Sequence, residues 1–291
     1  DALLVLGDTN SCLSVIGAKR LHIPIFHMEA GNRCFDECLP EETNRRIVDI
    51  ISDVNMCYSE HARRYLNASG IAKERTYVTG SPMAEVLHEN LKDIEASDIH
   101  SRLGLEKGKY ILLSAHREEN IDTEKNFLSL FTAINKLAEK YDMPILYSCH
   151  PRSRKRLEMS GFVLDSRVIQ HEPLGFHDYN CLQMNAYAVV SDSGTLPEES
   201  SFFISVGHAF PAVCIRTSTE RPEALDKGVF VLAGIDGQSL LQAVETAVDM
   251  NNNGDHGLPV PDYTDENVST KVVKLIQSYT GVVNKMVWRK Y

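Results

Sequence analysis

Residues 186–200 read Ala-Tyr-Ala-Val-Val-Ser-Asp-Ser-Gly-Thr-Leu-Pro-Glu-Glu-Ser. An apolar, strand-like run breaks at the small residues that follow Val190, and a helical stretch begins near Leu196. This order predicts a β-strand, a tight turn and a helix, which together form the repeating unit of an α/β sheet. The unpaired N–H groups and the positive end of such a helix favour a bound phosphate.

The same alternation of strand-like and helical runs extends along the whole chain. A first block has apolar runs at 1–8, 24–29, 54–58 and 75–79, and a second block has them at 109–115, 144–149, 167–172, 186–191, 211–216 and 228–233. Helical spacing is clear between two of these runs, where Phe127, Phe131 and Ile134 share one face. The rhythm predicts an α/β fold with parallel sheets.

Length and a connector between the blocks predict two domains. A chain of 291 residues exceeds what one hydrophobic core usually serves. Residues 83–107 read as a helix and a polar, glycine-containing connector. We therefore expect a first domain over 1–90, a second over 91–270, and a C-terminal helix within 271–291 that packs back toward the first. Because an apolar strand stands at residue 1 without flanking elements, we expect the start of the first domain to be missing.

Composition excludes several classes of protein. The formal charge of −10 and the pI near 5.6 argue against a surface for nucleic acid or anionic membrane. No apolar run approaches the roughly 20 residues that span a bilayer, and the first residues lack signal-peptide features, so we expect a cytoplasmic protein. Seven scattered cysteines predict no disulfide framework. Cys34 and Cys38 lack a second pair at zinc spacing, so no metal site is predicted.

Acidic residues gather where the strands of the first block end. Asp8 ends the first run, and Glu29 ends the second. Glu41 opens the helix that leads to the third run, and Arg45 follows one turn later. Since ligands bind at the carboxyl ends of parallel strands, we expect these three carboxylates to converge on one rim.

The second block carries other residue types at its strand ends. His116 and Arg117 begin a run that includes Glu119, and the next strand is followed by residues 150–152, His-Pro-Arg. Residues 193–195, Ser-Gly-Thr, form the predicted phosphate turn, with Glu199 on the helix after it. Arg221 is a charged partner for a diphosphate or for Glu199.

Each of these residues also has a purely structural interpretation. An Asp before a helix is more often a cap than a catalyst, and Glu41 and Glu42 by themselves are typical of a solvated helix start. His27 is as readily a hydrogen-bonded core histidine. Glu29 is harder to explain in structural terms, because an unpaired carboxylate at a buried rim costs free energy.

The order and spacing of the motifs carry more weight than any single one. The motifs are Gly-Asp-Thr (7–9), His-x-Glu-Ala-Gly (27–31), Pro-Glu-Glu-x-Asn-Arg (40–45), His-Arg-x-Glu-Asn (116–120), Asp-Ser-Gly with Glu-Glu (192–199) and Glu-Arg-Pro-Glu (220–223). In this order the chain resembles the non-hydrolysing UDP-N-acetylglucosamine 2-epimerase family over essentially its whole length. The resemblance implies two Rossmann-like domains that face a central cleft, a GT-B-like fold. It also implies a UDP-activated amino sugar as substrate, no cofactor, and a homodimer when full length.

The resemblance also implies a reaction and the residues for it. Hydrogen on C-2 of the sugar is not next to a carbonyl, so the bond from C-1 to the diphosphate must break first. Loss of the C-2 proton then gives a glycal, and protonation on the opposite face with return of UDP gives the epimer; two acid/base groups are expected. The implied catalytic residues are Asp8 and Glu29 as the proton-transfer pair, Glu41 in support, Arg45, and His116 on the facing domain.

The resemblance further implies which residues bind the nucleotide. Residues 193–195 match the diphosphate turn, Glu199 the residue that holds the ribose hydroxyls, and Arg221 a contact of the uridine nucleotide. The full set of implied substrate-binding residues is Arg117, Glu119, His150, Arg152, Ser193, Gly194, Thr195, Glu199 and Arg221.

The chain departs from the family's pattern at several places. The family's amino-terminal Gly-Thr-Arg-Pro-Glu turn does not occur, Glu118 replaces a commoner Arg, and the stretch 202–210 is longer than usual. With residues 31–36, Gly-Asn-Arg-Cys-Phe-Asp, these departures resemble a branch that acts on a 6-deoxy sugar. That branch converts UDP-2-acetamido-2,6-dideoxy-L-talose to UDP-N-acetyl-L-fucosamine for capsule or O-antigen synthesis. The alternative reaction converts UDP-N-acetylglucosamine to UDP-N-acetylmannosamine.

Other functions are compatible with the same fold. A retaining nucleotide-sugar glycosyltransferase would bind the same kind of ligand but does not need three carboxylates in one cluster. A hydrolysing epimerase would release free UDP, and a UDP-sugar-binding protein would have no activity. Deuterium incorporation at C-2 in heavy water distinguishes an epimerase from a transferase or a binding protein.

Overall fold

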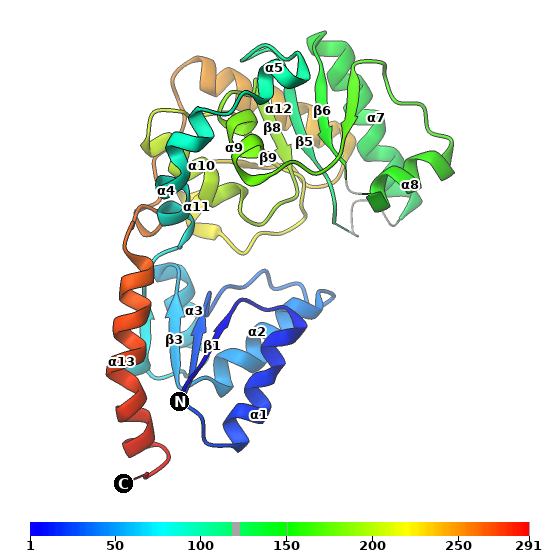
Figure 1. The fold of residues 1–291 in the computed structure, drawn as a ribbon. Helices are drawn as coiled ribbons and strands as arrows, with labels where there is room; N and C mark the ends of the chain where they lie inside the picture. The colour runs from blue at the N-terminus through cyan, green and yellow to red at the C-terminus, as the bar shows by residue number, and fades with distance from the viewer. Residues whose placement is uncertain (118–122, 150, 291) are drawn as a thin grey trace. The chain divides into compact units, whose positions relative to one another are not determined.

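The computed structural model describes residues 1–117, 123–149 and 151–290, with the side chain of Arg152 excluded. The chain divides into two compact units. Unit 1 comprises residues 1–86, 220–223 and 260–291, and unit 2 comprises residues 87–219 and 224–259. Each unit has one parallel β-sheet with packed helices (Figure 1). The predicted α/β class with parallel sheets is therefore confirmed.

Unit 1 contains a four-stranded sheet in the order β1-β2-β3-β4. Its strands are β1 (Leu3–Leu6), β2 (Ile25–Met28), β3 (Val54–Cys57) and β4 (Thr76–Val78), at the four positions that the apolar runs predict. Its helices are α1 (Val15–Arg20), α2 (Pro40–Ile51), α3 (Glu60–Ala68) and α13 (Val268–Met286), with short 3-10 turns at Asn10–Ser14, Lys73–Arg75 and Pro261–Tyr263.

The two faces of this sheet are covered by different parts of the chain. On one face, Val15 of α1 and Val48 of α2 pack against Ile25. On the other face, the helix α13 buries Val268, Val272 and Val283 against Phe26, Val54 and Met56 (Figure 1). A buried valine contributes about 1.5–3 kcal/mol relative to an exposed one. These contacts therefore hold a helix that is far away in sequence.

Unit 2 contains a six-stranded parallel sheet in the order β10-β9-β8-β5-β6-β7. Its strands are β5 (Ile111–Ser114), β6 (Ile145–Ser148), β7 (Val168–His171), β8 (Ala188–Ser191), β9 (Ala212–Cys214) and β10 (Val231–Leu232). The chain winds outward in one direction from β5 and in the other from β8, so the strand order reverses between these two neighbours. In sheets of this topology, ligands bind beside the carboxyl ends of the strands at the reversal.

Helices α7 and α12 cover one face of this sheet and form its main core with β5, β6 and β8. Among the described residues, the helices of this unit are α5 (Ile99–Leu103), α7 (Glu124–Tyr141), α8 (Pro151–Ser160), α9 (Phe176–Met184), α10 (Leu196–Ser205) and α12 (Gly237–Asn252). Two helices, α4 (Met83–Glu95) and α11 (Pro222–Asp226), contribute residues to both units. The stretch predicted to be an irregular connector contains the short helix α5. Burial of Ile99 and His100 holds this helix in place.

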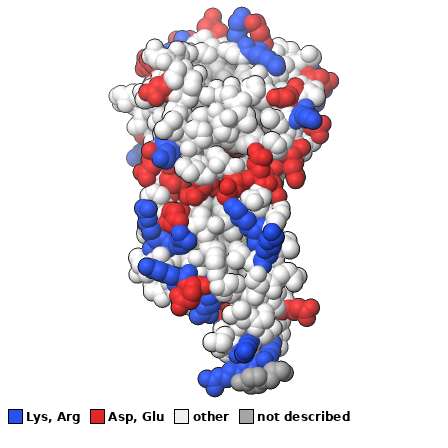
Figure 2. Space-filling model, turned by 90° about the vertical axis from the view of Figure 1, so that its left-hand side faces the viewer, with Lys and Arg blue, Asp and Glu red and all other residues white. Residues whose placement is uncertain are grey.

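The surface agrees with the acidic composition. On the face drawn in Figure 2, basic side chains are interspersed with acidic ones and form no broad basic patch. Among the described residues, no helix is long and apolar enough to cross a membrane.

Candidate active site

Asp8 and Glu29 follow neighbouring parallel strands of unit 1, at the same edge of the sheet. Strands β1 and β2 pair from Leu3 with Ile25 to Leu6 with Met28, and the Gly7 N–H donates to the Met28 carbonyl at 3.1 Å. A Cβ atom on Gly7 would lie 3.1 Å from Oε2 of Glu29. The Glu29 carboxylate therefore lies against the backbone that leads to Asp8.

Glu29 has an unusual backbone conformation. Its φ angle is +66°, in the left-handed region that residues other than glycine rarely adopt. Gly31 completes the turn with φ +79°, and a Cβ there would lie only 2.4 Å from the carbonyl oxygen of Ala62. Such strain is retained where the surrounding structure enforces it, and it is concentrated at functional sites.

Each of these two carboxylates is paired with an arginine of its own. Nη2 of Arg45, on α2, lies 2.5 Å from Oδ2 of Asp8. Nη2 of Arg221 lies 3.0 Å from Oε1 of Glu29, and its guanidinium carbon lies 5.5 Å from the centre of the Tyr58 ring. Asn32 also donates to Oε1 of Glu29, at 3.1 Å. Acidic and basic groups therefore alternate along this edge.

Two further buried carboxylates contact Arg45, and the sequence did not predict either of them as a site residue. Glu220 accepts from Nη2 of Arg45 at 3.2 Å, and Glu42 accepts from Nη1 at 3.4 Å. The structural interpretation of Glu42 as a solvated helix start is wrong, because this residue is fully buried. Glu42 and Arg45 are three positions apart on one helical face. Glu41, in contrast, is exposed in the first turn of α2 and has no hydrogen bond or ion pair among the described residues.

The surroundings of Asp8 shift its pKa upward. Burial has the largest effect, and it raises the pKa of Asp8. The negative charges of Glu29 and Glu220 raise this pKa further, whereas Arg45 lowers it. For Arg45, burial alone would lower the pKa, but the attraction of Asp8 and Glu220 outweighs burial and raises it. Arg45 therefore remains a cation, while Asp8 takes up a proton more readily than an exposed carboxylate. A carboxyl group of this kind is suited to proton transfer.

The predicted phosphate turn of unit 2 follows β8 and leads into α10. The backbone N–H of Thr195 donates to the Ser193 hydroxyl at 3.3 Å, and the two hydroxyl oxygens are 2.9 Å apart. A Cβ atom on Gly194 would lie 3.8 Å from Nη1 of Arg216 and 3.9 Å from Nη2 of Arg117. Two guanidinium groups therefore flank the glycine at the start of a helix, an arrangement that attracts an anion.

Asp192 joins this turn to the neighbouring strand end. Its Oδ2 accepts from the backbone N–H of His116 at 2.7 Å and from that of Arg117 at 2.8 Å. Nε of Arg117 donates to the Asp192 carbonyl at 3.1 Å. Because β5 and β8 flank the reversal of strand order, this carboxylate fixes the predicted residues His116 and Arg117 beside the turn.

Glu199 lies one helical turn beyond the phosphate turn and is held from two sides. Its Oε1 accepts from the Thr195 hydroxyl at 2.8 Å, and its Oε2 accepts from Nε2 of Gln183 at 3.0 Å. Burial raises the pKa of Glu199. Gln183 and Arg216 were not singled out in the sequence. Arg216 follows the apolar run of β9, so the strand-end signal that located His116 could also have located Arg216.

The structure thus gathers the predicted residues into two groups. Asp8, Glu29, Arg45 and Arg221 form the group in unit 1, and His116, Arg117, Ser193, Gly194, Thr195 and Glu199 form the group in unit 2. Glu119 and His150 lie outside the described residues, and so does the side chain of Arg152.

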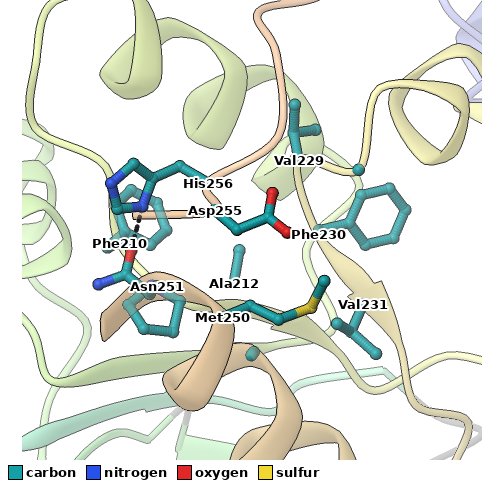
Figure 3. Close-up of a pocket in the computed structure, with 12 residues that line it drawn as sticks. Phe210, Ala212, Val229, Phe230, Val231, Met250, Asn251, Asp255 and His256 are labelled. Carbon is teal, nitrogen blue, oxygen red and sulfur yellow. Dashed lines mark hydrogen bonds between the residues drawn. The ribbon is translucent and has the colours of Figure 1, made fainter. Parts of the chain in front are cut away.

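A small cavity of about 40 Å³ lies elsewhere in unit 2 (Figure 3). Residues 210–212 and 228–231, which line it, lie at the amino ends of β9 and β10, opposite the edge that bears the phosphate turn. Nδ1 of His256 donates to Oδ1 of Asn251 at 2.7 Å on its rim. A cavity of this size holds a few water molecules, so it is no candidate for a nucleotide.

Comparison with known proteins places this geometry in a family. The family model described as UDP-N-acetylglucosamine 2-epimerase matches residues 1–277. A UDP-N-acetylglucosamine 2-epimerase of Methanococcus maripaludis is 35% identical over 262 residues, which are 87% of this chain and 70% of the relative. A UDP-2,3-diacetamido-2,3-dideoxy-D-glucuronate 2-epimerase of Pseudomonas aeruginosa is 31% identical and covers 84% of this chain and 67% of its own.

Solved structures give the same result. The structure of UDP-N-acetylglucosamine 2-epimerase from Rickettsia bellii has a TM-score of 0.90 and 44% identity, covering 100% of this chain and 76% of that one. The Methanocaldococcus jannaschii UDP-GlcNAc 2-epimerase in complex with UDP-GlcNAc and UDP has a TM-score of 0.85 and 29% identity, covering 96% and 76%. The predicted Rossmann-like fold class is confirmed by these matches. The chain is therefore a member of the UDP-N-acetylglucosamine 2-epimerase family, and it is an isomerase.

Proposed function

We propose that this enzyme inverts C-2 of a UDP-N-acetylhexosamine by eliminating UDP and adding it back. The C-1–oxygen bond to the diphosphate breaks, and C-2 loses a proton to give a glycal and UDP. A proton then adds to the opposite face of C-2, and the diphosphate oxygen returns to C-1. No net oxidation occurs, so the reaction needs acid/base groups and an anion site.

The observation that carries this proposal is the pair of carboxylates at the ends of β1 and β2. Asp8 and Glu29 lie on adjacent strands, and each is bound to an arginine. Removal of a proton from one face and delivery to the other needs two such groups. We assign proton transfer to Asp8 and Glu29, and a supporting role to the exposed Glu41.

Unit 2 supplies a second line of support. The turn at Gly194, with Arg117 and Arg216 beside it, suits a nucleotide diphosphate. We assign the diphosphate to residues 193–195 and the ribose to Glu199. His116 is assigned to the departing phosphate oxygen, since it lies at the same strand edge. Tight retention of UDP would keep the glycal from escaping before it is protonated again.

The substrate we propose first is UDP-2-acetamido-2,6-dideoxy-L-talose, converted to UDP-N-acetyl-L-fucosamine. Its support is residues 31–36, the stretch that departs from the family's common pattern. Asn32 donates to Glu29, and Sγ of Cys34 lies 3.7 Å from Nη1 of Arg45, so this stretch contacts one proposed proton-transfer group and the arginine that pairs with the other. UDP-N-acetylglucosamine is the second candidate, because the similar proteins of M. maripaludis and R. bellii are named UDP-N-acetylglucosamine 2-epimerases.

Three further assignments go with this proposal. We propose that the reaction serves the synthesis of capsule or O-antigen precursors, and that it takes place in the cytoplasm. All seven cysteines, each within the described residues, are free thiols, as a reducing compartment maintains them. We also propose a homodimer as the working state.

The test is incubation of the enzyme with each UDP-sugar in heavy water, followed by NMR spectroscopy. We expect deuterium at C-2 of both epimers and no accumulation of free UDP, with the larger kcat/KM on the 6-deoxy sugar. Stoichiometric free UDP would instead identify a hydrolysing epimerase. Unchanged C-2 hydrogen with either sugar would refute the proposal, and faster turnover of UDP-N-acetylglucosamine would reverse the order of the two substrates.

A further inference from the structure

His27 is fully buried in unit 1, and both of its ring nitrogens face hydrogen-bond acceptors. Nδ1 lies 3.0 Å from Oδ1 of Asp49, and Nε2 lies 3.2 Å from the carbonyl oxygen of Gly7. The His27 ring therefore bridges the Asp49 carboxyl group and the Gly7 carbonyl.

Asp49 contacts further buried groups besides His27. Oδ1 accepts from His27 and also from the backbone N–H of Gly31, at 3.2 Å. Nη2 of Arg33 lies 2.6 Å from Oδ2. The Asp49 carboxyl group therefore connects the His27 ring, the Gly31 backbone and the Arg33 guanidinium.

The contact between His27 and Asp49 holds the backbone next to both proposed proton-transfer residues. The Gly7 carbonyl, which accepts from His27, belongs to the peptide bond that leads into Asp8. The Gly31 N–H, which donates to Asp49, closes the strained turn that begins at Glu29. Helix α2, which carries Asp49, also supplies Asn44, whose Nδ2 donates to the Asp8 carbonyl at 2.9 Å.

We propose that His27, as a bridge between Asp49 and the Gly7 carbonyl, is a positioning residue that fixes the Asp8 and Glu29 carboxylates relative to each other. This inference rests on the proposed function, because it supposes that these two groups carry out the proton transfers. His27 does not touch the substrate in this account. It acts through the two peptide segments that it ties to one carboxylate.

A second buried histidine provides a matched control. In unit 2, Nε2 of His100 lies 3.0 Å from the Tyr110 hydroxyl, and burial lowers the pKa of His100. His100 is thus a core histidine with a different kind of partner, remote in sequence from the motifs. The substitutions His27→Gln and His100→Gln remove the same side chain from two buried sites.

The experiment measures kcat, KM and the rate of C-2 deuterium exchange for both variants, with UDP-N-acetylglucosamine and the 6-deoxy sugar as probes. Glutamine lacks the second ring nitrogen and cannot bridge Asp49 and the Gly7 carbonyl. We therefore expect His27→Gln to lower kcat and exchange about 30- to 100-fold, the scale of an ångström-sized misplacement of reacting groups, with KM within about twofold. His100→Gln should lower the melting temperature and leave kcat unchanged. Asp49→Asn should match His27→Gln, and the double variant should lose little more, because the two residues act as one unit.

A loss confined to KM, equal losses of kcat in the two histidine variants, or additive losses in the double variant would each overturn the inference. The bridge is tested separately by ¹⁵N NMR of histidine-labelled protein. We expect a hydrogen-bonded ring N–H of His27 that is protected from exchange with solvent, and a ring without such an N–H would also overturn the inference. If the unsubstituted enzyme fails to exchange C-2 hydrogen, the proposed function falls, while the NMR result still tests the bridge.

Discussion

The carboxyl edges of the two sheets carry opposite kinds of polar group, although both are parallel and built from the same strand–helix unit. At the edge of unit 1, Asp8 and Glu29 face arginines through ion pairs. At the edge of unit 2, the carboxylates of Asp192 and Glu199 are occupied by internal hydrogen bonds, and hydroxyls, a glycine and two arginines remain around the turn. One edge offers groups that exchange protons, and the other offers groups that bind an anion. The same topology therefore supports two chemistries, according to whether the carboxylates pair with arginines or accept hydrogen bonds from backbone and neutral side chains.

Removal of either proposed proton-transfer carboxylate at the edge of unit 1 should give the largest loss of activity. We expect Asp8→Asn and Glu29→Gln each to lower kcat about 10³-fold, within the range for a general acid or base, while the affinity for UDP changes little. Steady-state kinetics and calorimetric titration with UDP measure the two quantities. Glu37→Gln is the matched control, because that carboxylate is exposed and pairs only with Arg46 among the described residues. A variant of Asp8 or Glu29 that keeps its kcat but loses UDP would erase the distinction between the two edges.

Arg221 has two possible roles, one at each edge. The family resemblance implies a nucleotide contact for it, whereas the structure pairs its guanidinium with Glu29. We expect Arg221→Gln to lower kcat about 10- to 100-fold through misplacement of that carboxylate, with the dissociation constant of UDP within about twofold. A large loss of UDP affinity at unchanged kcat would return Arg221 to the nucleotide. Arg63→Gln is a suitable control, since its ion pair with Glu60 is half-exposed and remote from the motifs.

The edge of unit 2 is tested by a substitution that adds only a methyl group. A Cβ at Gly194 meets no atom closer than 3.8 Å, so alanine fits, but it fills space between the Arg117 and Arg216 guanidinium groups. We expect Gly194→Ala to weaken UDP binding about tenfold, equivalent to ~1.4 kcal/mol, and to leave the melting temperature unchanged. Gly175→Ala, where a Cβ meets nothing within 4 Å, should bind UDP normally. Equal affinities of the two variants for UDP would contradict an anion site at this turn.

Only some residues of the two sheet edges could be predicted from the sequence. Strand positions and the residues immediately after them could be predicted, because apolar runs and polar strand ends are local patterns. Asp8, Glu29 and the turn at Gly194 are of this kind. Glu42 could not be recognised, because its burial depends on which face of α2 packs toward the strand ends. Local composition at a helix start resembles a solvated surface.

Partners that are distant in the chain were also beyond the sequence. Glu220 reaches Arg45 across 175 positions, and Arg221 reaches Glu29 across 192. Gln183 binds Glu199 from a neighbouring helix, and no periodic pattern distinguishes it from other polar residues of α9. The sequence therefore identifies groups that do chemistry more readily than the groups that hold them, because holding groups are defined by three-dimensional contacts.

The smallest predicted effect is on the melting temperature, and it depends on the pH through the ionisation of Asp8. The pKa of Asp8 is raised above its ordinary value of 3.8, chiefly by burial, so the folded state binds this proton more tightly than the unfolded state. The free energy of unfolding therefore decreases as the pH rises from below 3.8 through the folded pKa, and the cost of the charged form is complete above it. Asparagine mimics the neutral form, so Asp8→Asn should melt on the order of 2 °C above the unsubstituted enzyme at pH 7.

This gain in melting temperature should shrink as the pH falls toward 3.8, because the native carboxyl group becomes neutral there. Calorimetric melting curves between pH 4 and pH 8 measure it. Asp165→Asn is the control of opposite sign: hydrogen bonds from Arg167 lower the pKa of Asp165 to about 2, so that substitution should not stabilise the protein at pH 7. An Asp8→Asn variant that is destabilised at neutral pH would mean that its ion pair with Arg45 outweighs burial. In that case Asp8 would be a structural anion like Asp192, and the two edges would differ less than their contacts indicate.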